Sequence, residues 1–370
     1  MLARPAVRYG LILFLSLTAA CQAAPAATAV VATASPTATR VSTATPSPAP
    51  TSIRTPPALP GPYQSRFLNP LDAAYAYEQD TCEFLRNKWD SGKAAPGTVV
   101  MIIMLHSINR DKGEGPDAMT AALFGRMLAD LKETHFEAIN TDQLAGFLEN
   151  NDRIPYRSVV IIQDGRRYPD NFNTHFRGTW DEWGWPVVNA WDPQGSTTDS
   201  LWEPYRALSD EGMVDFQTYG PTFGAQAKPP SDKYLRGQLQ QPIDVLQERL
   251  GKTPIGVVWP SGFSQQSVSI ARELGYRLGF TFNPRGPVMY NWVPQSDAID
   301  KFRPSYQPEA PVGDPLMTLP RFWPHQVHRA LDQVRIAGDE AADYAESSKS
   351  TELEYYDIVC AATYGSINQE

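Results

Sequence analysis

The chain has 370 residues, enough for one large domain or two of ordinary size. It carries 41 acidic and 32 basic residues, and the net charge of -9 argues against nucleic-acid binding, which needs a basic face to displace counterions from phosphate. Aromatic residues make up 11% of the chain and include 9 Trp, a residue that packs in cores and also stacks on sugar rings.

The first 21 residues have the pattern of an export signal. Arg4 and Arg8 precede an apolar stretch, 9–20, that is too short to span a bilayer well. Small residues then stand directly before Cys21, as in a bacterial lipobox, although Thr18 occupies a position that is usually aliphatic. We expect a lipoprotein-type signal peptide over 1–21, with Cys21 lipidated and the protein anchored to the outer face of the cell membrane. An ordinary signal peptide that is cleaved nearby is the alternative.

Residues 22–62 consist mainly of Ala, Thr, Ser and Pro and contain almost no charge. Such a segment cannot bury enough apolar surface to offset the entropy of ordering, so we expect an extended, disordered tether. The folded domain is then expected over 63–370. Two cysteines remain after export, Cys82 and Cys360, and an even pair in an oxidising compartment suggests one disulfide. Two separate buried thiols are the alternative.

From residue 98 onward, predicted strands and helices alternate. The strands are expected at 99–105, 138–140, 159–162, 186–191, 214–218, 255–259 and 278–282. The helices are expected at 118–134, from a cap at Thr141 onward, and at 171–183, 201–211, 235–250 and 267–274. This alternation predicts an α/β fold with a mainly parallel sheet, open or closed into a barrel. A Pro-rich loop at 304–320, a last helix at 327–336 and a short strand or helix at 355–361 complete the expected elements.

The strand at 159–162 runs directly into Gln163, Asp164 and Gly165. A continuous apolar, β-branched run is typical of a strand whose sheet is covered by helices on both faces. The carboxyl end of such a strand is where α/β proteins usually place their functional residues. Asp164 therefore either binds a ligand or caps the turn that follows.

The order of short motifs resembles the polysaccharide deacetylase family, whose NodB-homology domain is found in carbohydrate esterases. The motifs are IIMLHSI (102–108), DLKETHFEAINTDQL (130–144), IPYRSVVIIQDG (154–165), DEGMVDFQTYG (210–220), WPSGF (259–263) and LPRF (319–322). The resemblance covers about 98–322 and implies a distorted (β/α) barrel. It also implies glycan as the partner and, for an active enzyme, hydrolysis of the carbon–nitrogen bond of glycan N-acetyl groups.

Members of this family use two aspartates, a base and a metal ligand, together with two histidines in an H-x-x-x-H pattern. A divalent metal of the zinc type, held with one open position, lowers the pKa of its bound water and polarises the substrate carbonyl. The carboxylate base then removes the proton of the water, and a histidine protonates the leaving amine.

This chain departs from the family pattern at the residues that carry the chemistry. Gln163 stands in place of the base, and an amide cannot accept a proton at neutral pH. Asp164 matches the metal ligand, but the segment that should supply the two histidines contains Gln217 and Tyr219 instead. These side chains are expected to hydrogen-bond a ligand without a metal.

The resemblance also indicates roles for residues around Asp164. His106 ends the first strand and is expected on the same face as Asp164, so His106 or His175 would complete a divalent metal site if one forms. Trp259 matches an element that lines the family's active-site groove. Arg321 matches an arginine that orients the base, and with Gln163 at that position we expect its partner to be Asp164.

The remaining candidates lie outside the family motifs. Trp180 and Trp183 are spaced to share one helical face beside acidic residues, which suits either a carbohydrate platform or core packing. His325 and His328 are three residues apart, which suits a metal pair only with a third ligand, and otherwise a packed or solvated face. Two functions follow from the sequence: a glycan hydrolase with relocated ligands, or a non-catalytic carbohydrate-binding or scaffolding lipoprotein.

Overall fold

The computed structural model describes residues 54–109, 118–165, 168–194, 197–222 and 230–369. The expected signal peptide, Cys21 and most of the expected tether lie outside these residues. Residues 54 to 370 belong to one compact unit. No helix among the described residues has both the length and the apolar character needed to cross a membrane.

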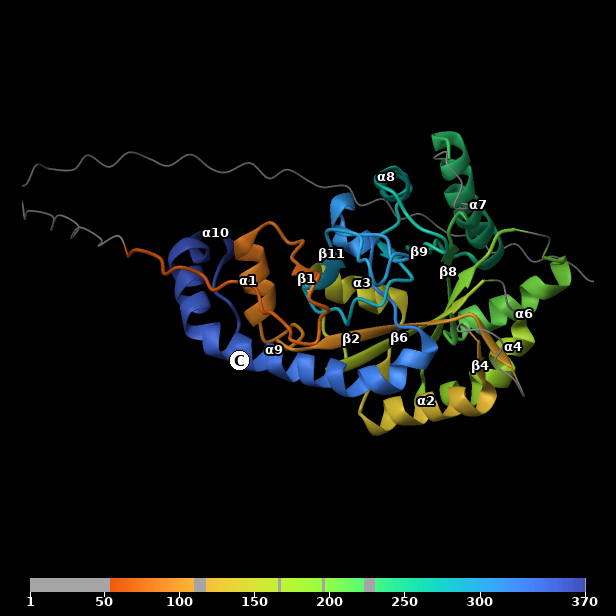
Figure 1. Cartoon of the computed structure of the whole chain (residues 1–370), viewed down its shortest axis with the longest axis horizontal. Helices are drawn as coiled ribbons and strands as arrows, with labels where there is room; N and C mark the ends of the chain where they lie inside the picture. Colours follow the sequence, from red (N-terminus) through yellow and green to blue (C-terminus); the bar gives the residue numbers. More distant parts are fainter. Residues whose placement is uncertain (1–53, 110–117, 166–167, 195–196, 223–229, 370) are drawn as a thin grey trace, which may run out of the picture. The chain divides into compact units, whose positions relative to one another are not determined.

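The core of the fold is a curled parallel sheet (Figure 1). Its strands lie in the order β10-β9-β8-β7-β6-β2, and the short strand β5 pairs with the first half of β6. The strands are β2 (Val99–Leu105), β5 (Glu137–Ala138), β6 (Arg157–Asp164), β7 (Val187–Trp191), β8 (Val214–Tyr219), β9 (Gly256–Val258) and β10 (Leu278–Phe280). Each neighbouring pair is parallel, so all carboxyl ends lie at one end of the sheet, here called the carboxyl end, and the other is called the amino end.

A four-residue segment, 319–322, joins the two edges of this sheet. Leu319 forms a bridge with Phe280 of β10, and Phe322 forms a bridge with Ile103 of β2. The backbone N–H of Leu319 donates to the carbonyl of Gly279 at 2.8 Å, and that of Phe322 donates to Ile102 at 2.7 Å. Because one irregular segment contacts both edge strands, the sheet closes into a distorted barrel, and the fold class predicted from the sequence is confirmed.

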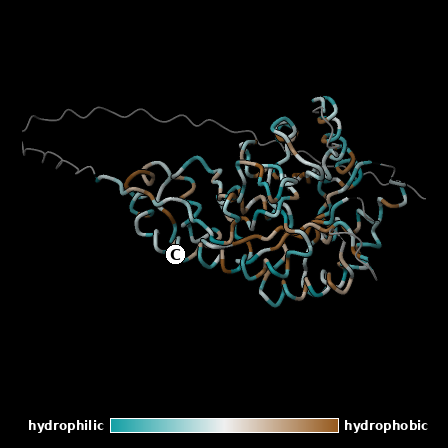
Figure 2. The backbone as a smooth tube through the Cα atoms, in the orientation of Figure 1, coloured by the Kyte–Doolittle hydropathy of each residue, from teal (hydrophilic) through white to brown (hydrophobic). Residues whose placement is uncertain are grey.

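The composition of β2 explains why the sheet forms at this position. All seven of its residues are buried. Val99, Met101 and Ile103 belong to the cluster beneath the outer helices, while Val100 and Ile102 belong to the cluster inside the barrel. Both faces are therefore covered, which accounts for the unbroken apolar run that is brown in Figure 2.

Helices cover the barrel in the order that the sequence predicted. They are α2 (Ala121–Glu133), α3 (Thr141–Asn150), α4 (Pro169–His175), α5 (Arg177–Trp183), α6 (Asp199–Asp210), α7 (Asp232–Leu250) and α8 (Gln265–Glu273). Leu144, Phe147 and Leu148 of α3 are buried. The expected cap at Thr141 is wrong by one residue, because the side chain of Asn140 accepts the capping bond from Gln143. The amide of Thr141 instead donates to Asp215 of β8 at 2.9 Å.

The last long helix, α9 (Pro324–Val359), has 36 residues and extends far beyond the predicted end at 336. The second half contains few large apolar residues, so its periodicity does not predict a buried face. It buries small residues such as Ala341, Ala345 and Ser348 instead. Figure 1 shows α9 running along the barrel and past it to α1 (Thr81–Trp89) and α10 (Ala361–Tyr364).

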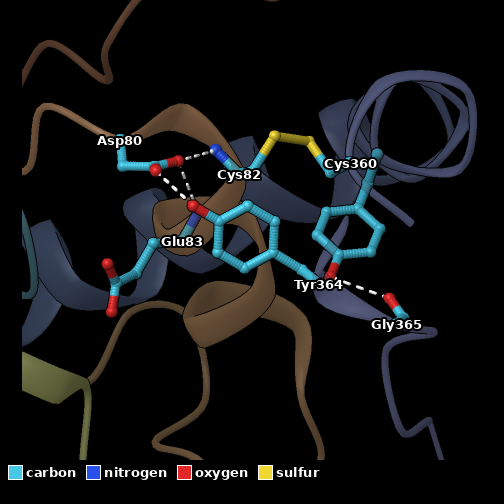
Figure 3. Close-up of a disulfide and its surroundings, with 7 residues drawn as sticks. Asp80, Cys82, Glu83, Cys360, Tyr364 and Gly365 are labelled. Carbon is cyan, nitrogen blue, oxygen red and sulfur yellow. Dashed lines mark hydrogen bonds between the residues drawn. A yellow bond between two sulfur atoms is a disulfide. The ribbon is translucent and has the colours of Figure 1, made fainter. Parts of the chain in front are cut away.

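The N-terminal part of the domain packs against this extension. Cys82 at the start of α1 and Cys360 at the end of α9 form a disulfide (Figure 3). The last residues of the expected tether also lie along α9, because Arg54 forms ion pairs with Glu354 and Asp357. The chain therefore contacts α9 from Arg54 onward. Charged residues on α9 hold a segment that has little apolar surface of its own.

Two further strand pairs lie outside the barrel sheet. β1 (Asp72–Tyr75) pairs antiparallel with β11 (Val293–Ser296), and β3 (Ser107–Asn109) pairs with β4 (Ala118–Thr120). The Pro-rich loop predicted at 304–320 contains two short 3-10 turns, η1 (Ala310–Val312) and η2 (Pro315–Met317). These elements were too short for the sequence pattern to predict.

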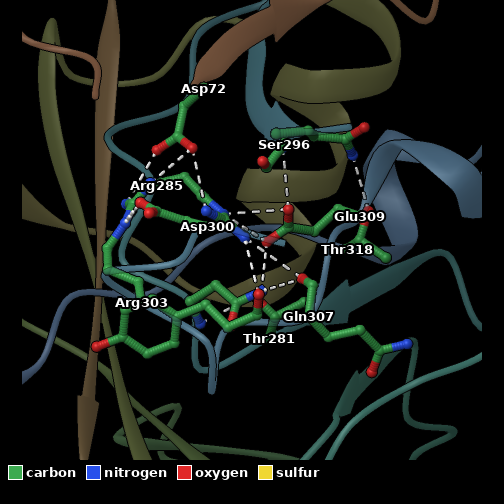
Figure 4. Close-up of polar contacts among 12 residues, drawn as sticks. Asp72, Thr281, Arg285, Ser296, Asp300, Arg303, Gln307, Glu309 and Thr318 are labelled. Atoms are coloured by element: carbon green, nitrogen blue, oxygen red, sulfur yellow. Dashed lines mark hydrogen bonds and ion pairs between the residues drawn. The ribbon is translucent and has the colours of Figure 1, made fainter. Parts of the chain in front are cut away.

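A buried ionic cluster fixes the loop that follows β11 (Figure 4). Arg285 contacts Asp72 at 3.0 Å and Glu309 at 2.9 Å, and all three side chains are fully buried. Burial raises the pKa of Glu309, although Arg285 acts against this shift. The side chain of Asn283 donates to Glu309, and the backbone carbonyl of Asn283 accepts the backbone N–H of Arg321 at 3.2 Å. The cluster thus holds the segment that closes the barrel.

Candidate functional site

A buried ion pair lies at the carboxyl end of the barrel. Asp164 ends β6, Arg321 comes from the closing segment, and their side chains are 2% and 1% exposed. One guanidinium nitrogen donates to Asp164 Oδ1 at 2.6 Å, while Arg321 Nε donates to the carbonyl of Thr281 at 2.7 Å. This is the partner that the sequence predicted for Arg321. The guanidinium therefore supplies the positive charge that a buried carboxylate requires.

The second oxygen of Asp164 is unused. Oδ2 is buried, has no hydrogen-bond partner in the described part of the chain, and lies 3.6 Å from Nε2 of His106. That distance is too long for a hydrogen bond. His106 follows β2, as expected, and its side chain is 33% exposed. The structure thus brings His106 and Asp164 together and leaves one buried acceptor atom without a partner among the described residues.

Trp323 completes this group. Its ring lies nearly parallel to the ring of His106, with centroids 6.0 Å apart and an interplanar angle of 11°. Among the described residues, neither Trp323 Nε1 nor His106 Nδ1 has a hydrogen-bond partner, although both atoms are buried. The group thus contains an unpaired donor, Trp323 Nε1, and an unpaired acceptor, Asp164 Oδ2. It also contains His106 Nδ1, a ring nitrogen that can donate or accept. We call Asp164, Arg321, His106 and Trp323 the strand-end site.

The side-chain amide of Gln163 makes hydrogen bonds that a carboxylate cannot make. Its Nε2 donates to the carbonyls of Leu105 at 2.9 Å and His106 at 3.1 Å, which joins the ends of β6 and β2. Asn189 on β7 makes a matching connection by donating to the carbonyls of Gln163 and Gly165. A carboxylate at position 163 has no proton to donate to these carbonyls. The amide therefore holds the strand ends that carry Asp164 and His106.

The two candidate residues on β8, Gln217 and Tyr219, have different surroundings. Gln217 Oε1 accepts the backbone N–H groups of Ile255 and Gly256 at 2.8 and 2.7 Å, so this side chain anchors the start of β9. Gln217 is aligned with Ala190 of β7, which is aligned with Asp164, so it lies two strands from Asp164 at the same level of the sheet. Tyr219 ends β8 and packs, half-buried, against the cluster inside the barrel.

Trp259 is a packing residue in this structure. It is fully buried in the cluster beneath α7 and α8, and its Nε1 donates to the carbonyl of Met317 at 2.8 Å. Both its apolar surface and its single donor are therefore used inside the protein.

Trp180 and Trp183 lie at the amino end, away from Asp164. Their neighbour Trp185 donates to Glu137 at 2.7 Å, and Glu137 is aligned in the sheet with Ser158. Ser158 precedes Asp164 by six positions in β6, or roughly 20 Å along a strand. Trp180 donates to Glu211 at 3.0 Å, and Lys132 lies 5.6 Å from the ring of Trp183. These contacts favour the packing alternative over a sugar platform beside Asp164.

The other histidines lie in separate surroundings. His175 ends α4 with its ring edge-on to Phe124 at 6.5 Å, and His325 lies 6.5 Å from the ring of Trp323. His328 is exposed and contacts Asp130 at 2.9 Å. In the described ranges, no group of three or more His, Cys, Asp or Glu side chains is placed to hold a metal.

The residues present do not fit the three-ligand metal site of the family. Asp164 and His106 are the two residues here whose side chains are of a metal-binding type. The charge of Asp164 is already matched by Arg321 at 2.6 Å. A divalent cation at Oδ2 would be repelled by that guanidinium across the same carboxylate. The strand-end site is therefore better suited to a neutral hydrogen-bonding ligand.

Sequence reasoning missed Trp323 and Asn189. Trp323 directly follows the LPRF motif, so its position next to Arg321 was a usable signal. Asn189 lies in a strand identified only by its apolar neighbours, and its role depends on the alignment of β7 with β6, where it faces Gln163. That alignment cannot be read from the sequence.

Comparison with known proteins gives likenesses in fold alone. No protein-family model matches the chain, and no curated protein matches it. The deacetylase PplD of Streptococcus pyogenes is 18% identical, with a TM-score of 0.49 over 64% of this chain and 99% of that one. IcaB from Ammonifex degensii is 13% identical, with a TM-score of 0.47 over 66% of this chain and 100% of that one. A polysaccharide deacetylase from Bacillus cereus is 15% identical, with a TM-score of 0.45 over 63% and 69% of the two chains. Two of these three solved structures are named as deacetylases.

Proposed function

We propose that this protein is an exported, non-catalytic glycan-binding protein that uses a barrel of the polysaccharide deacetylase type. Its strand-end site binds the polar groups of a glycan and does not hydrolyse them. The observation that carries this proposal is the buried Arg321–Asp164 pair, in which one carboxylate oxygen is used and the other has no partner.

The unpaired atoms define the chemistry of the ligand. A buried acceptor without a partner costs roughly 1–3 kcal/mol, and a ligand that donates a hydrogen bond to it removes that cost. Asp164 Oδ2 requires a donor, and Trp323 Nε1 requires an acceptor. Sugar hydroxyl groups act as both, and an acetamido group supplies one N–H and one carbonyl. The partly exposed ring of His106 adds a flat surface next to these atoms.

The same residues argue against the hydrolysis reaction of the family. Gln163 occupies the position of the base, and its amide protons are already donated to Leu105 and His106. Gln217 occupies a region where the family has metal-binding histidines, and its side chain is bonded to the backbone of β9. Base and metal ligands are therefore replaced by groups that hold the barrel together.

A second function has one specific observation in its favour. His106 Nε2 lies 3.6 Å from Asp164 Oδ2, and an imidazole beside a carboxylate is a common acid–base pair. In this alternative the protein is a glycan hydrolase in which His106 moves protons. Such an enzyme would lose activity on His106→Gln substitution.

The location of the protein is part of the proposal. The lipobox-like sequence before Cys21 and the following Pro- and Thr-rich segment suit a protein tethered to the outer face of a cell membrane. The Cys82–Cys360 disulfide is consistent with an oxidising compartment. Envelope or extracellular glycan would then be within reach, and metabolic labelling with a fatty acid, compared with a Cys21→Ser variant, tests the anchor.

A binding experiment distinguishes the two functions. The full chain is titrated calorimetrically with chito-oligomers and peptidoglycan fragments in the presence of a chelator, and acetate release is measured in parallel. We expect saturable binding without metal and no acetate release. Asp164→Asn keeps an oxygen for Arg321 but replaces the free acceptor with a donor, so binding should weaken by about tenfold or more.

The control for this variant is Asp170→Asn, which makes the same change at an exposed position on α4. It should bind like the unaltered protein. Chelator-resistant acetate release that disappears in His106→Gln would favour the hydrolase. No binding to any glycan in the panel would contradict the main proposal.

A further inference from the structure

A cavity lies beside the amino end of the barrel. The cavity has a volume of about 230 Å³ and is lined mainly by four segments: residues 60–63, α1, the loop 289–292 and α9. It is bounded on the barrel side by Thr98, directly before β2, and by Phe147 of α3. None of the strand-end residues lines it, so it is distinct from the site around Asp164.

Six aromatic residues line the cavity. Phe84 of α1 stacks on Tyr290, with ring centroids 5.9 Å apart. Tyr63 lies 6.0 Å from both Trp292 and Tyr344, and all five residues line the cavity. Rings arranged in this way offer both faces and edges to a further ring, the two arrangements that aromatic pairs prefer.

The polar groups of the wall are already paired within the protein. The ammonium of Lys88 contacts the two oxygens of Glu352 at 2.8 and 2.7 Å, and Trp89 donates to the same carboxylate at 2.7 Å. The hydroxyl of Tyr344 donates to the carbonyl of Gly61 at 2.7 Å. Among the described residues, no wall residue carries a buried side-chain atom that lacks a partner. A ligand therefore needs to supply no hydrogen bond, and apolar contact is what the cavity offers.

The cavity is held open by links between its walls. The Cys82–Cys360 disulfide and the Lys88–Glu352 ion pair both join α1 to α9. The bond from Tyr344 to Gly61 fixes the segment 60–63 over the cavity, while Gly61 and Pro62 themselves remain exposed at its rim. An apolar cavity of about 150 Å³ in another protein remains dry and binds benzene, so a larger one with aromatic walls can hold a larger ring compound.

We propose that this cavity is a binding site for a compact, uncharged aromatic molecule, which enters beside Gly61 and Pro62 and packs between the Phe84–Tyr290 and Tyr63–Trp292 pairs. The ligand is recognised by ring stacking and by exclusion from water. This site is independent of the glycan proposal, because it shares no residue with the strand-end site.

The test uses the full, oxidised chain and N-phenyl-1-naphthylamine, an uncharged dye that fluoresces strongly in apolar surroundings. We expect saturable binding of one dye per chain and competition by naphthalene. Ala345, which is 4% exposed and lines the cavity from α9, is replaced in the variant Ala345→Leu to fill the space. Dye affinity should fall by about tenfold or more, because the added side chain occupies the volume of the ligand.

The matched control is Ser347→Leu, which adds an apolar side chain on the exposed face of the same helix and should leave dye affinity within about twofold. Ala341→Leu is a second filling variant in case Ala345→Leu does not fold, which a thermal melt reveals. Absence of saturable binding would overturn the proposal, as would unchanged affinity in the filling variants that fold. Displacement of the dye by dodecanoate but not by naphthalene would also overturn it, because the site would then take acyl chains.

Discussion

The carboxyl end of the barrel and the α1–α9 contact beside its amino end each contain an ion pair, and the pairs differ in which oxygens they leave without a partner. At the carboxyl end, Arg321 binds one oxygen of Asp164 and the other oxygen has no partner. At the amino end, Lys88 and Trp89 together bind both oxygens of Glu352. The unpaired oxygen at the strand-end site predicts a hydrogen-bonding ligand there. The fully paired carboxylate beside the cavity predicts an apolar ligand.

The largest effect that we expect concerns the amino end. Replacing both Cys82 and Cys360 with serine opens a link between residues 278 positions apart. In the chain-entropy model, a loop of this length contributes on the order of 5 kcal/mol to the free energy of unfolding. Denaturant unfolding of the oxidised chain and of the double variant measures the difference. Dye binding in the cavity should weaken as α1 and α9 separate, whereas glycan binding should be unchanged under conditions in which the variant is folded.

The next effect concerns the carboxyl end. Arg321→Met should lower the free energy of unfolding by roughly 3–5 kcal/mol, because it leaves Asp164 buried without its charge partner. The double variant Asp164→Leu, Arg321→Met removes both charges and should be more stable than Arg321→Met alone. If Arg321→Met proved as stable as the unaltered chain, the ion pair would not be the feature that organises this end.

A smaller effect is expected when a carboxylate replaces Gln163, and it tests whether that single substitution produces hydrolysis. Gln163→Asp places a carboxylate against the carbonyls of Leu105 and His106, which now accept hydrogen bonds from the amide. We expect stability to fall by about 1–3 kcal/mol and acetate release to remain absent. Gln163→Glu, which keeps the chain length, serves as the comparison. Appearance of deacetylase activity in either variant would mean that the site retains the family's catalytic geometry.

The smallest effect is a pH dependence at the amino end. Burial acts to raise the pKa of Glu137, but hydrogen bonds from Lys132 and Trp185 outweigh it and hold the pKa below its ordinary value of 4.5. A lowered pKa in the folded state stabilises the protein above pH 4.5, and this contribution is lost as the pH falls through the folded value. Glu137→Gln should therefore flatten the dependence of stability on pH below 4.5, which unfolding experiments at several acidic pH values can detect. An unchanged pH profile would show that Glu137 is not held by these bonds.

Much of the barrel could be predicted because its strands and helices each show a clear pattern within a short stretch of sequence. The seven residues of β2 form an unbroken apolar run, and helices with clear periodicity separate most of the later strands. The pairing of Arg321 with Asp164 was also predictable, because each residue lies in a motif with a known place in the family and one carboxylate of the usual two is missing. By contrast, α9 was predicted too short, because its second half buries alanine and serine in place of large apolar residues.

Features that depend on how distant segments meet could not be predicted. Trp180 and Trp183 follow the Asp164 strand in sequence, but α4 and α5 carry the chain back to the amino end before β7 begins. The cavity combines aromatic residues from positions 63, 84, 290, 292 and 344, which no pattern in the sequence relates to one another. The sequence alone places Gln163 where the resembled family has its base, but the bonds of Gln163 to the end of β2 required the alignment of two strands.

The central claim is that the carboxyl end of this barrel binds glycan through Asp164 Oδ2 without metal and without hydrolysis. Calorimetric titration of chito-oligomers in the presence of a chelator, with acetate measured in the same samples, tests it most directly. The account predicts saturable binding that Asp164→Asn weakens and Asp170→Asn does not, with no acetate above background. Acetate release that stops when the chelator is added would contradict it.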